Sequence, residues 1–356
     1  MSSTFGNKVK ISVFGESHGN GIGVVIDGLP AGFKVNMDAV LAQMARRAPG
    51  RDKTATPRKE KDLPKILSGM LEDTLTGAPL CAVIENTNTR SGDYGNLMTC
   101  PRPGHSDYTA YVKYNASNDV RGGGHFSGRI TAPLVFAGAV CRQLLAAQGV
   151  RVAAHIYSIG NVHDKPFDPV HIDGALMERL SLSSFALIDR GAEESMRAEV
   201  EDARMQLDSV GGVIECAVTG VPAGFGGPMF DGVEGVIAQA LFGIPAIKGV
   251  EFGSGFASAA MRGSQNNDPF RVEDGKVVTS TNNCGGILGG ITDGMPLVFR
   301  AAVKPTPSIG QVQQSVDLQT MQNTELTVNG RHDPCIVPRA VPVVEAMTAI
   351  ALMNIL

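Results

Sequence analysis

Alternating apolar and polar positions predict two strands near the amino terminus. Residues 9–14 (VKISVF) alternate between the two kinds of side chain, and an apolar run at 24–26 precedes an Asp-Gly dipeptide. A period of two is typical of a half-buried strand, and Asp-Gly is a frequent turn signal. We therefore expect two successive strands, joined through the glycine-rich residues 15–23.

Four longer segments place apolar residues at helical spacing: 38–47, 131–148, 193–207 and 341–356. Spacings of three and four residues are typical of an amphipathic helix. The second segment is apolar on almost every side, so we expect it in the interior. The fourth is interrupted by Pro342 and Glu345 and is too short to cross a bilayer, so no membrane role is expected.

Two segments of the first part of the chain return in the second part, in the same order. Residues 21–33 resemble 211–225, and residues 69–87 resemble 286–306. Ordered repetition is the sequence signature of a duplicated architecture. It predicts two halves, about 1–190 and 200–356, related by a pseudo-twofold axis with a site between them. The alternative is that glycine-rich hairpins resemble one another by chance.

Composition restricts the class of protein. The chain has 356 residues, 43% hydrophobic and 19% charged, which suffices for one large domain or two of ordinary size. Its net charge of −4 argues against a general nucleic-acid surface. The six cysteines are widely spaced without a CxxC pair, so reduced thiols and a cytoplasmic location are expected.

The pentapeptide GESHG (15–19) matches the G-x-S-x-G pattern of a serine-hydrolase nucleophile elbow, with Ser17 in the nucleophile's place. That elbow requires a helix immediately after the serine, whereas a second strand is expected here. We therefore exclude the hydrolase interpretation. The pentapeptide is better explained as a turn that presents Ser17 and His18 to an anionic ligand.

Four of the seven histidines lie in loops rich in Gly, Pro and Arg: His18, His105, His125 and His332. The other three occupy a polar stretch that we expect to be a surface insertion: His155, His163 and His171. None shows the spacing of a zinc site, so no metal is expected. Imidazoles in rigid loops are candidates for proton transfer, and Asp333 is a candidate carboxylate partner.

Cations are concentrated in the same loops. RGGGHFSGR (121–129) flanks three glycines with two arginines, and backbone amides beside guanidinium groups suit a phosphate or carboxylate. KPTPSIG (304–310) offers a lysine and two hydroxyl groups for a second anion. An acidic chain with this arrangement is predicted to bind a small ligand with several negative groups. The cations concerned are Arg47, Arg102, Arg121, Arg129, Lys304 and Arg331.

These loops, in this order, resemble the chorismate synthases over essentially the whole chain. The motifs that carry the resemblance include GESHG, KILSG, IENTNTRSGDY, RPGHSDYT, RGGGHFSGR, KGVEFGSGF, GGILGGITDG, KPTPSI and GRHDPCIVPRAVPVVEAM. The resemblance implies a single domain of the α+β class, residues 1–356. Its fold would be a β-α-β sandwich with internal pseudo-twofold duplication and helices between antiparallel sheets. It also implies a homotetramer.

The activity implied by this resemblance is that of a carbon-oxygen lyase, the last enzyme of the shikimate pathway of aromatic amino acid biosynthesis. Phosphate is lost from 5-enolpyruvylshikimate 3-phosphate by anti-1,4-elimination, which gives chorismate. The reaction requires reduced FMN (FMNH2) without net redox change, and NADPH enters only as a reductant of the flavin. The implied partners are this small molecule and further copies of the chain, with no nucleic acid and no membrane.

Site residues follow from the matching motifs. The resemblance implies catalytic roles for His18, His105, Asp333, Ser17 and Ser127. It implies substrate binding by Arg47, Lys53, Arg102, Arg129 and Arg331. It implies flavin contacts by His125, Phe126, Ser127, Pro245, Ala246, Gly289, Lys304, Pro305, Thr306, Pro307, Ser308 and Arg331. His18 would protonate or stabilise the departing phosphate, and Asp333 would assist removal of the carbon-6 proton.

The chain departs from the family's pattern in the phosphate cradle. His125, Phe126 and Gly128 replace the arginine, serine and alanine of many members, and Pro245 replaces an asparagine. A histidine at this place predicts a more pH-dependent affinity for flavin or substrate. The residues alone leave three alternatives: a flavin-dependent oxidoreductase acting on an anionic small molecule, a metal-dependent phosphatase with Asp333 as nucleophile, and a non-catalytic module that binds a flavin or another anion.

Overall fold

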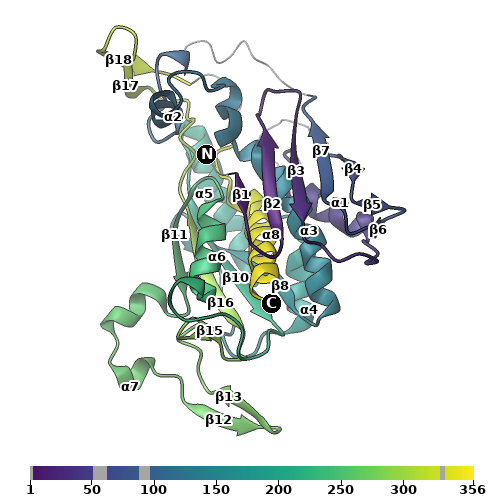
Figure 1. Ribbon diagram of the computed structural model, residues 1–356. Coiled ribbons are helices and arrows are strands. Elements are labelled where there is room, and N and C mark those ends of the chain that lie inside the picture. Colours follow the sequence, from purple (N-terminus) through teal and green to yellow (C-terminus); the bar gives the residue numbers. More distant parts are fainter. Residues whose placement is uncertain (1–2, 51–61, 88–96, 329–332) are drawn as a thin grey trace.

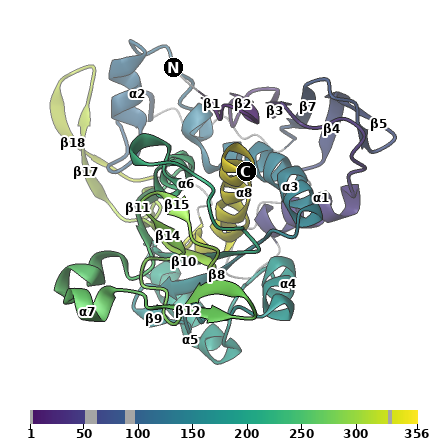
Figure 2. The ribbon, with the colours of Figure 1, turned by 60° about the horizontal axis from the view of Figure 1, so that its bottom comes forward.

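Two antiparallel sheets enclose a layer of helices (Figures 1 and 2). The computed structural model describes residues 3–50, 62–87, 97–328 and 333–356. The strand order of the first sheet is β1 (Thr4–Phe5), β2 (Lys10–Gly15), β3 (Gly21–Asp27), β7 (Leu80–Glu85), β4 (Pro64–Ser68). That of the second is β9 (Val162–His163), β8 (Arg151–Ile159), β10 (Gly212–Thr219), β16 (Leu297–Val303), β11 (Ile247–Phe252). The architecture is the α+β sandwich expected from the sequence.

The two sheets have equivalent strand orders. β2 and β3 occupy the same places as β8 and β10, β7 the same place as β16, and β4 the same place as β11. A short hairpin precedes β7 and β16 alike. These hairpins are β5 (Met70–Leu71) with β6 (Thr74–Leu75), and β14 (Ile287–Leu288) with β15 (Ile291–Thr292). The agreement supports the duplication predicted from the repeated segments.

The division between the halves lies earlier in the chain than the predicted boundary near 190–200. β8 pairs with β10 as a full member of the second sheet, whereas the preceding helix α3 (Thr131–Ala147) packs on strands of the first. The structural division therefore falls between α3 and β8. The two repeated segments of the second half, 211–225 and 286–306, both follow β8. They therefore gave no sign that β8 is the first strand of that half.

The prediction of a surface insertion around His155 is also wrong. His155 lies in β8 and is fully buried between Asp164, at 2.9 Å, and Glu215 of β10, at 3.1 Å. The two carboxylates supply partners for both ring nitrogens, which explains how a polar residue enters a central strand. His163 and His171, by contrast, are exposed.

Helices α3 and α8 (Val337–Ile355) form the centre of the helix layer and pack against each other. α3 faces β3 and α8 faces β8 and β10, while α1 (Met37–Arg47) and α6 (Val233–Phe242) flank the pair. A Cβ atom added at Gly138 of α3 would lie 2.2 Å from the Cβ of Ala346 in α8. Only glycine allows the two helices to come this close.

A buried carboxylate connects the helices to the second sheet. Glu345 of α8 is fully buried and accepts hydrogen bonds from Arg46 of α1, at 2.5 Å, and from Arg142 of α3, at 2.9 Å. It also accepts from the backbone N–H of Ala154 in β8 at 3.0 Å. The charged residue that interrupts the apolar pattern of 341–356 thus pairs with the buried Arg46 and the half-buried Arg142 and does not break the helix.

The four predicted helices and the two predicted strands are confirmed, with shifted ends. α1, α3 and α5 (Glu193–Met205) end at or near the predicted limits, and the strands are β2 and β3. α8 begins at Val337 rather than 341, with Pro338 in its first turn and Pro342 inside it. A proline in the first turn loses no intrahelical bond, because the N–H groups there have no partner within the helix.

The remaining elements lie around this core. They are α2 (Asp107–Lys113), α4 (Gly174–Leu182), α7 (Gly263–Asn266), the hairpin of β12 (Phe270–Glu273) and β13 (Lys276–Thr279), and the hairpin of β17 (Gln313–Asp317) and β18 (Gln322–Leu326). An arm that contains α7, β12 and β13 projects from the body (Figure 1). The segment Gly128–Ala147 has the length and apolarity of a membrane span, but 78% of its most apolar window is buried inside the protein.

Candidate active site

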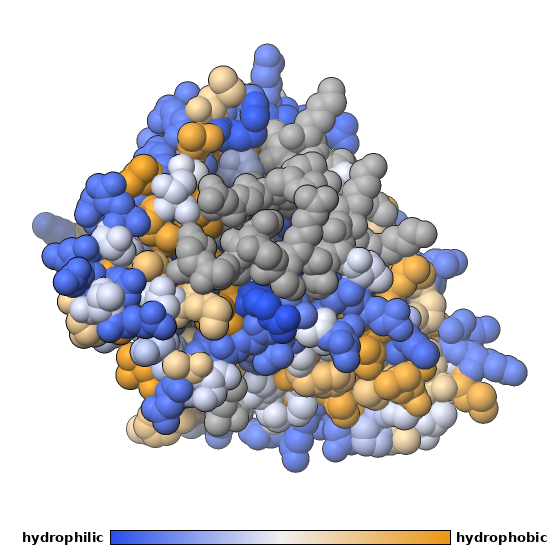
Figure 3. All heavy atoms as spheres, turned by 90° about the horizontal axis from the view of Figure 1, so that it is seen from above, coloured by the Kyte–Doolittle hydropathy of each residue, from blue (hydrophilic) through white to orange (hydrophobic). Residues whose placement is uncertain are grey.

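A cavity of about 1040 Å³ opens at the end of the helix layer where α1 ends and α3 and α8 begin. Residues of both halves line it, from β1 and β2 of the first sheet to the start of α8. Figure 3 looks onto this end of the molecule, where the described surface carries mostly hydrophilic side chains with hydrophobic ones scattered among them. The volume is at the upper end of the range of small-molecule sites, so it has room for more than one ligand.

Three consecutive glycines bring two of the predicted histidines together. Gly122, Gly123 and Gly124 have φ values of 59°, 85° and 54°, a conformation that favours glycine. A Cβ atom at Gly122 would lie 2.3 Å from the ring of His18, and one at Gly123 would lie 3.3 Å from Nε2 of His105. The glycines are therefore needed both for the shape of the turn and for the close approach of each imidazole ring to it.

Ser17 and His18 lie behind this glycine turn and are only 3% and 7% exposed. The backbone N–H of Ser17 donates to the carbonyl of Gly124 at 3.1 Å, which ties the GESHG turn to the three glycines. Within the described part of the chain, the Ser17 hydroxyl has no hydrogen-bond partner. A buried hydroxyl of this kind is a candidate contact for a ligand.

On the other side of the glycine turn, Arg102 and His105 share the carboxylate of Asp107. Arg102 donates to its two oxygens at 2.7 and 2.8 Å, and Nδ1 of His105 lies 2.6 Å from one of them. Burial alone would raise the pKa of Asp107, but the hydrogen bonds from Arg102 and His105 hold it well below its usual range. An ionised carboxylate only accepts, so Nδ1 carries a hydrogen and Nε2 is directed toward Gly123.

Asp62 holds two further arginines predicted to bind substrate. Its carboxylate accepts from Nη1 of Arg47 at 2.6 Å and, through the other oxygen, from Nη1 of Arg129. All three side chains are almost fully buried. Burial lowers the pKa of Arg47 to about 10, although Asp62 opposes this effect. The cluster keeps a net positive charge, while the carboxylate offsets the desolvation of the guanidinium groups.

The expectation that Arg121 and Arg129 form one cradle around the glycines is wrong. Arg121 pairs with Asp119 at 2.7 Å on the surface and does not line the cavity. Arg129 turns inward to Asp62. The left-handed residues between the two arginines turn the chain, so the two side chains leave it on different sides.

Asp333 reaches the cavity from the segment that precedes α8. Its backbone carbonyl accepts a hydrogen bond from the Thr306 hydroxyl at 3.1 Å, and its carboxylate accepts one from Arg339 of α8. The loop that contains Thr306 lines the same wall through Lys304, Thr306, Pro307 and Ser308. Burial and the neighbouring Lys248 lower the pKa of Lys304. The predicted loop and the predicted carboxylate therefore share one wall of the cavity.

His125 is fixed by the protein on both sides of its ring. Nδ1 lies 2.8 Å from the backbone carbonyl of Gly15, and Nε2 lies 2.8 Å from the hydroxyl of Ser3. Because a carbonyl oxygen only accepts, Nδ1 carries a hydrogen. This arrangement links the first strands to the glycine turn and leaves neither ring nitrogen for a ligand.

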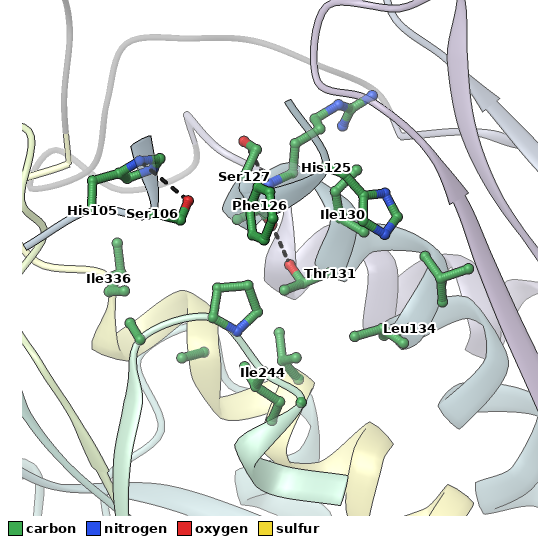
Figure 4. Close-up of a pocket in the computed structure, with 18 of the residues that line it drawn as sticks. His105, Ser106, His125, Phe126, Ser127, Ile130, Thr131, Leu134, Ile244 and Ile336 are labelled. Atoms are coloured by element: carbon green, nitrogen blue, oxygen red, sulfur yellow. Dashed lines mark hydrogen bonds between the residues drawn. The ribbon is translucent and has the colours of Figure 1, made fainter. Parts of the chain in front are cut away.

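Apolar side chains form another wall of the cavity: Ile130, Leu134, Ile244, Ile336, Val343 and Met347. In the view of Figure 4, His105 and Ser127 lie along the upper side of the cavity and Ile244 along the lower side. In the same view Ile130 lies beside His125, so polar and hydrocarbon side chains adjoin one another around the cavity. Such a cavity suits a ligand, or a pair of ligands, with both anionic and apolar parts.

Comparison with known proteins decides the family. The family model of chorismate synthase matches residues 9–356. The chain belongs to the chorismate synthase family. Chorismate synthase of Dehalococcoides mccartyi is 48% identical over 355 residues, which cover 100% of this chain and 96% of that protein. Chorismate synthase of Thermococcus kodakarensis is 48% identical over 349 residues, which cover 98% and 96%.

A solved structure of a chorismate synthase has the same fold. It is 28% identical to this chain, with a TM-score of 0.76, and the match covers 99% of this chain and 92% of that one. Chorismate synthases are carbon-oxygen lyases of the shikimate pathway, which leads to the aromatic amino acids. The family assignment therefore identifies this chain as an enzyme.

Most of the site residues predicted from the chorismate synthase motifs line the same cavity. They are Arg47, Arg102, His105, His125, Phe126, Ser127, Arg129, Pro245, Ala246, Lys304, Thr306, Pro307, Ser308 and Asp333. Ser17 and His18 lie behind Gly122. Pro305 and Gly289 are not in the lining, and Gly289 lies in the turn between β14 and β15. Lys53, Arg331 and His332 lie outside the described residues.

The chorismate synthase motifs did not single out the side chains that hold the predicted residues in place: Asp62, Asn86, Asp107 and Arg339. Asp107 stands two residues after His105, and this spacing could have marked it as a partner. The other contacts join distant segments. Asn86, for example, accepts from Nε of Arg129 at 3.1 Å and donates to the carbonyls of Glu16 and Gly19 at 2.9 Å. No local pattern in the sequence marks such a contact.

Proposed function

We propose that the protein converts 5-enolpyruvylshikimate 3-phosphate to chorismate and inorganic phosphate by anti-1,4-elimination, and that reduced FMN is required without net redox change. One observation carries the proposal for this chain. Asp333 and the glycine turn face the same cavity, and the turn has His18 against Gly122 and His105 against Gly123. The cations of this cavity come from both halves of the chain. Family membership supplies the reaction class, and this convergence supplies the groups that the reaction needs.

The substrate carries two carboxylates and a phosphate, and the cavity has a matching excess of positive charge. Arg47 and Arg129 share one carboxylate, and Arg102 and His105 share another. Each carboxylate fixes the direction of its cations and leaves a positive local field. Preorganised charge of this kind stabilises an anionic ligand without reorganisation during the reaction.

The residues present fit a flavin. The apolar wall of Ile130, Leu134 and Ile244 suits the hydrocarbon part of a flavin ring, and the loop 304–308 offers an ammonium group and two hydroxyl groups for its phosphate. Reduced FMN, when bound, would supply an electron-rich ring system beside the substrate. The sequence has no strand, G-x-G-x-x-G and helix in succession for a dinucleotide, which disfavours an oxidoreductase that transfers hydride from a nicotinamide to the substrate. NADPH therefore enters the proposal only as a reductant of the flavin.

The elimination breaks one carbon-hydrogen and one carbon-oxygen bond and forms one carbon-carbon double bond. We assign to Asp333 the removal of the carbon-6 proton. We assign to His18 the stabilisation or protonation of the leaving phosphate, which departs with the electron pair of the carbon-oxygen bond. His105, oriented by Asp107, would adjust the charge beside the flavin ring. Groups of this kind contribute about 10²- to 10⁴-fold each to a proton transfer.

We further propose a homotetramer in the cytoplasm. The projecting arm exposes large apolar side chains, Phe256, Phe270, Val272 and Val277, each at least 63% exposed. Such a patch is typical of a contact between copies of a chain. All six cysteines are free thiols, which suits a reducing compartment. Light scattering with size-exclusion chromatography tests the assembly, and a monomeric mass at micromolar concentration would contradict it.

An anaerobic assay tests the proposed reaction. Purified protein is mixed with 5-enolpyruvylshikimate 3-phosphate without flavin, with oxidised FMN and with chemically reduced FMN, and both phosphate and chorismate are measured. We expect product only with reduced FMN, in amounts far above the flavin oxidised. Phosphate release without flavin would favour a phosphatase, and product equal to the flavin oxidised would favour an oxidoreductase.

A further inference from the structure

The arginines at the cavity differ in how many of their guanidinium nitrogens the protein itself uses. Arg47 donates from Nε to Thr131, from Nη1 to Asp62 and from Nη2 to the carbonyl of Gly128. All three of its nitrogens therefore have acceptors within the protein. The side chain is only 4% exposed, which leaves little of it for a ligand.

Arg102 and Arg129 are engaged to the same extent. Arg102 donates to Asp107 from Nε and Nη2, and to the Ser308 hydroxyl from Nη1 at 3.0 Å. Arg129 donates from Nε to Asn86, from Nη1 to Asp62 and from Nη2 to the carbonyl of Glu85. Their side chains are 4% and 5% exposed. These arginines shape the cavity and its field, but the protein already uses each of their nitrogens.

Arg339 is different. Its Nε donates to the backbone carbonyl of Arg47 at 2.9 Å and its Nη1 to the carboxylate of Asp333. Among the described residues no acceptor is bonded to its Nη2, and the side chain, 20% exposed, lines the cavity. The two bonds fix the plane of the guanidinium group, so the direction of the remaining N–H donors is fixed as well.

The position of Arg339 gives it a second property. It stands in the first turn of α8, and the carbonyl that it binds belongs to the last residue of α1. The dipole of α1 favours a cation at its carboxyl end, whereas the amino end of α8 disfavours one, so the dipoles alone do not hold Arg339. Its two hydrogen bonds hold it, and they leave Nη2 without an acceptor among the described residues.

We propose that Arg339 is a substrate-binding residue, whose Nη2 donates to an anionic oxygen of the substrate next to Asp333. This inference rests on the proposed function, because it names a contact for the substrate of that reaction. One planar group would then bind both the carboxylate that removes the proton and the molecule that loses it. The distance between the two would be set by a rigid fork rather than by two independent side chains.

A binding measurement tests the contact without relying on turnover. Calorimetric titration of the flavin-free protein with 5-enolpyruvylshikimate 3-phosphate is compared for wild type, Arg339→Met and Arg339→Lys. We expect Arg339→Met to weaken binding about 10- to 100-fold, the usual loss for a hydrogen bond between charged groups. Lysine keeps the charge but cannot form the same fork, so we expect it to restore part of the affinity.

A matched control and a second background complete the experiment. Arg204 of α5 pairs with Glu201 on the surface, and Arg204→Met should leave substrate affinity within about twofold. In an Asp333→Asn background, Arg339→Met should still weaken binding. Loss of the effect in that background would show that Arg339 acts only by holding Asp333, and would overturn the proposed contact.

Inorganic phosphate as a second probe locates the anion. A parallel loss of phosphate affinity in Arg339→Met points to the phosphate group, and a loss confined to the substrate points to a carboxylate. Unchanged affinity for both, in a variant whose melting temperature matches wild type, would refute the inference. Absence of turnover in the wild type would overturn the proposed reaction instead, so the two failures are distinguishable. If Arg339→Met does not fold, Arg339→Gln takes its place.

Discussion

Nδ1 of His105 lies 2.6 Å from a carboxylate oxygen of Asp107, and Arg102 bonds both oxygens of the same carboxylate. The buried carboxylate is ionised because its pKa is held well below the usual range, so it can only accept from the imidazole. His105 is thereby kept in one tautomer, with Nε2 directed toward Gly123.

Asp107→Asn should disturb this arrangement with little change of shape. The amide cannot accept from both Arg102 and His105 as the carboxylate does, so the ring loses its fixed tautomer. We expect kcat to fall about 10²-fold, while FMN still binds. Steady-state rates with reduced FMN measure the effect. Asp202→Asn, at an exposed position of α5, is the control, and equal rates in both variants would contradict a role for Asp107.

Gly122→Ala should displace His18. The new Cβ atom would lie 2.3 Å from the ring of His18, so the ring or the glycine turn must move. Misplacement of a reacting group by about 1 Å costs about 10²-fold in rate, and we expect a loss of at least that size. Gly128→Ala in the same loop is the control, because among the described residues, its chain neighbours aside, no atom lies within 4 Å of a Cβ there. Equal activity in the two variants would rule out the packing argument.

His18→Ala and Asp333→Asn test the proton-transfer groups directly. Each should lower turnover by about 10²- to 10⁴-fold and leave FMN binding largely intact. Flavin affinity, measured by fluorescence titration, separates loss of chemistry from loss of the cofactor site. A variant that turns over at the wild-type rate would remove its residue from the mechanism.

The pH dependence of stability should contain a contribution from His155. Burial alone would lower the pKa of the imidazole, but its hydrogen bonds with Asp164 and Glu215 raise it. A group whose pKa is raised by folding stabilises fully below its unfolded pKa, about 6.5, and this stabilisation is lost as pH rises through the folded value. We therefore expect His155→Gln to reduce the free energy of unfolding more at about pH 6 than at about pH 9.

Urea unfolding at the two pH values measures this difference. The pKa values of Asp164 and Glu215 are lowered, so both carboxylates stay ionised at either pH and do not add to the difference. His171→Gln, which changes an exposed imidazole, should show no such dependence. A loss of stability from His155→Gln that is equal at both pH values would show that the buried ring is neutral throughout.

Glu345→Gln should destabilise the helix layer. The substitution leaves the buried Arg46 and the half-buried Arg142 without their carboxylate, and removal of one partner from a buried pair costs about 3–5 kcal/mol. Chemical unfolding measures the change. Glu201→Gln, which alters an exposed pair with Arg204, should have little effect. A similar small effect at Glu345 would mean that the amide satisfies both arginines.

Periodicity predicted the helices well because burial and period agree there. The segment 131–148 is apolar on almost every side, and α3 lies between α8 and the first sheet. The pattern of polar residues gave a wrong prediction for β8, because His155 and its polar neighbours made this buried strand resemble a surface segment. Its burial depends on Asp164 in the following segment and on Glu215 of another strand, 60 residues away, and a local pattern cannot report that second partner.

Motifs and repeated segments were enough to predict the family, the internal duplication and the loops that carry chemistry, because motifs and turns are local. The order of the strands in each sheet came from the structure. Glycines such as Gly122 could be recognised as turn formers, but only the tertiary structure placed His18 and His105 on either side of the turn. The structure alone also decided which cations remain open to a ligand. Charge is a property of a residue, whereas pairing with Asp62 or Asp107 depends on how distant segments pack, and that packing leaves the open donor on Arg339.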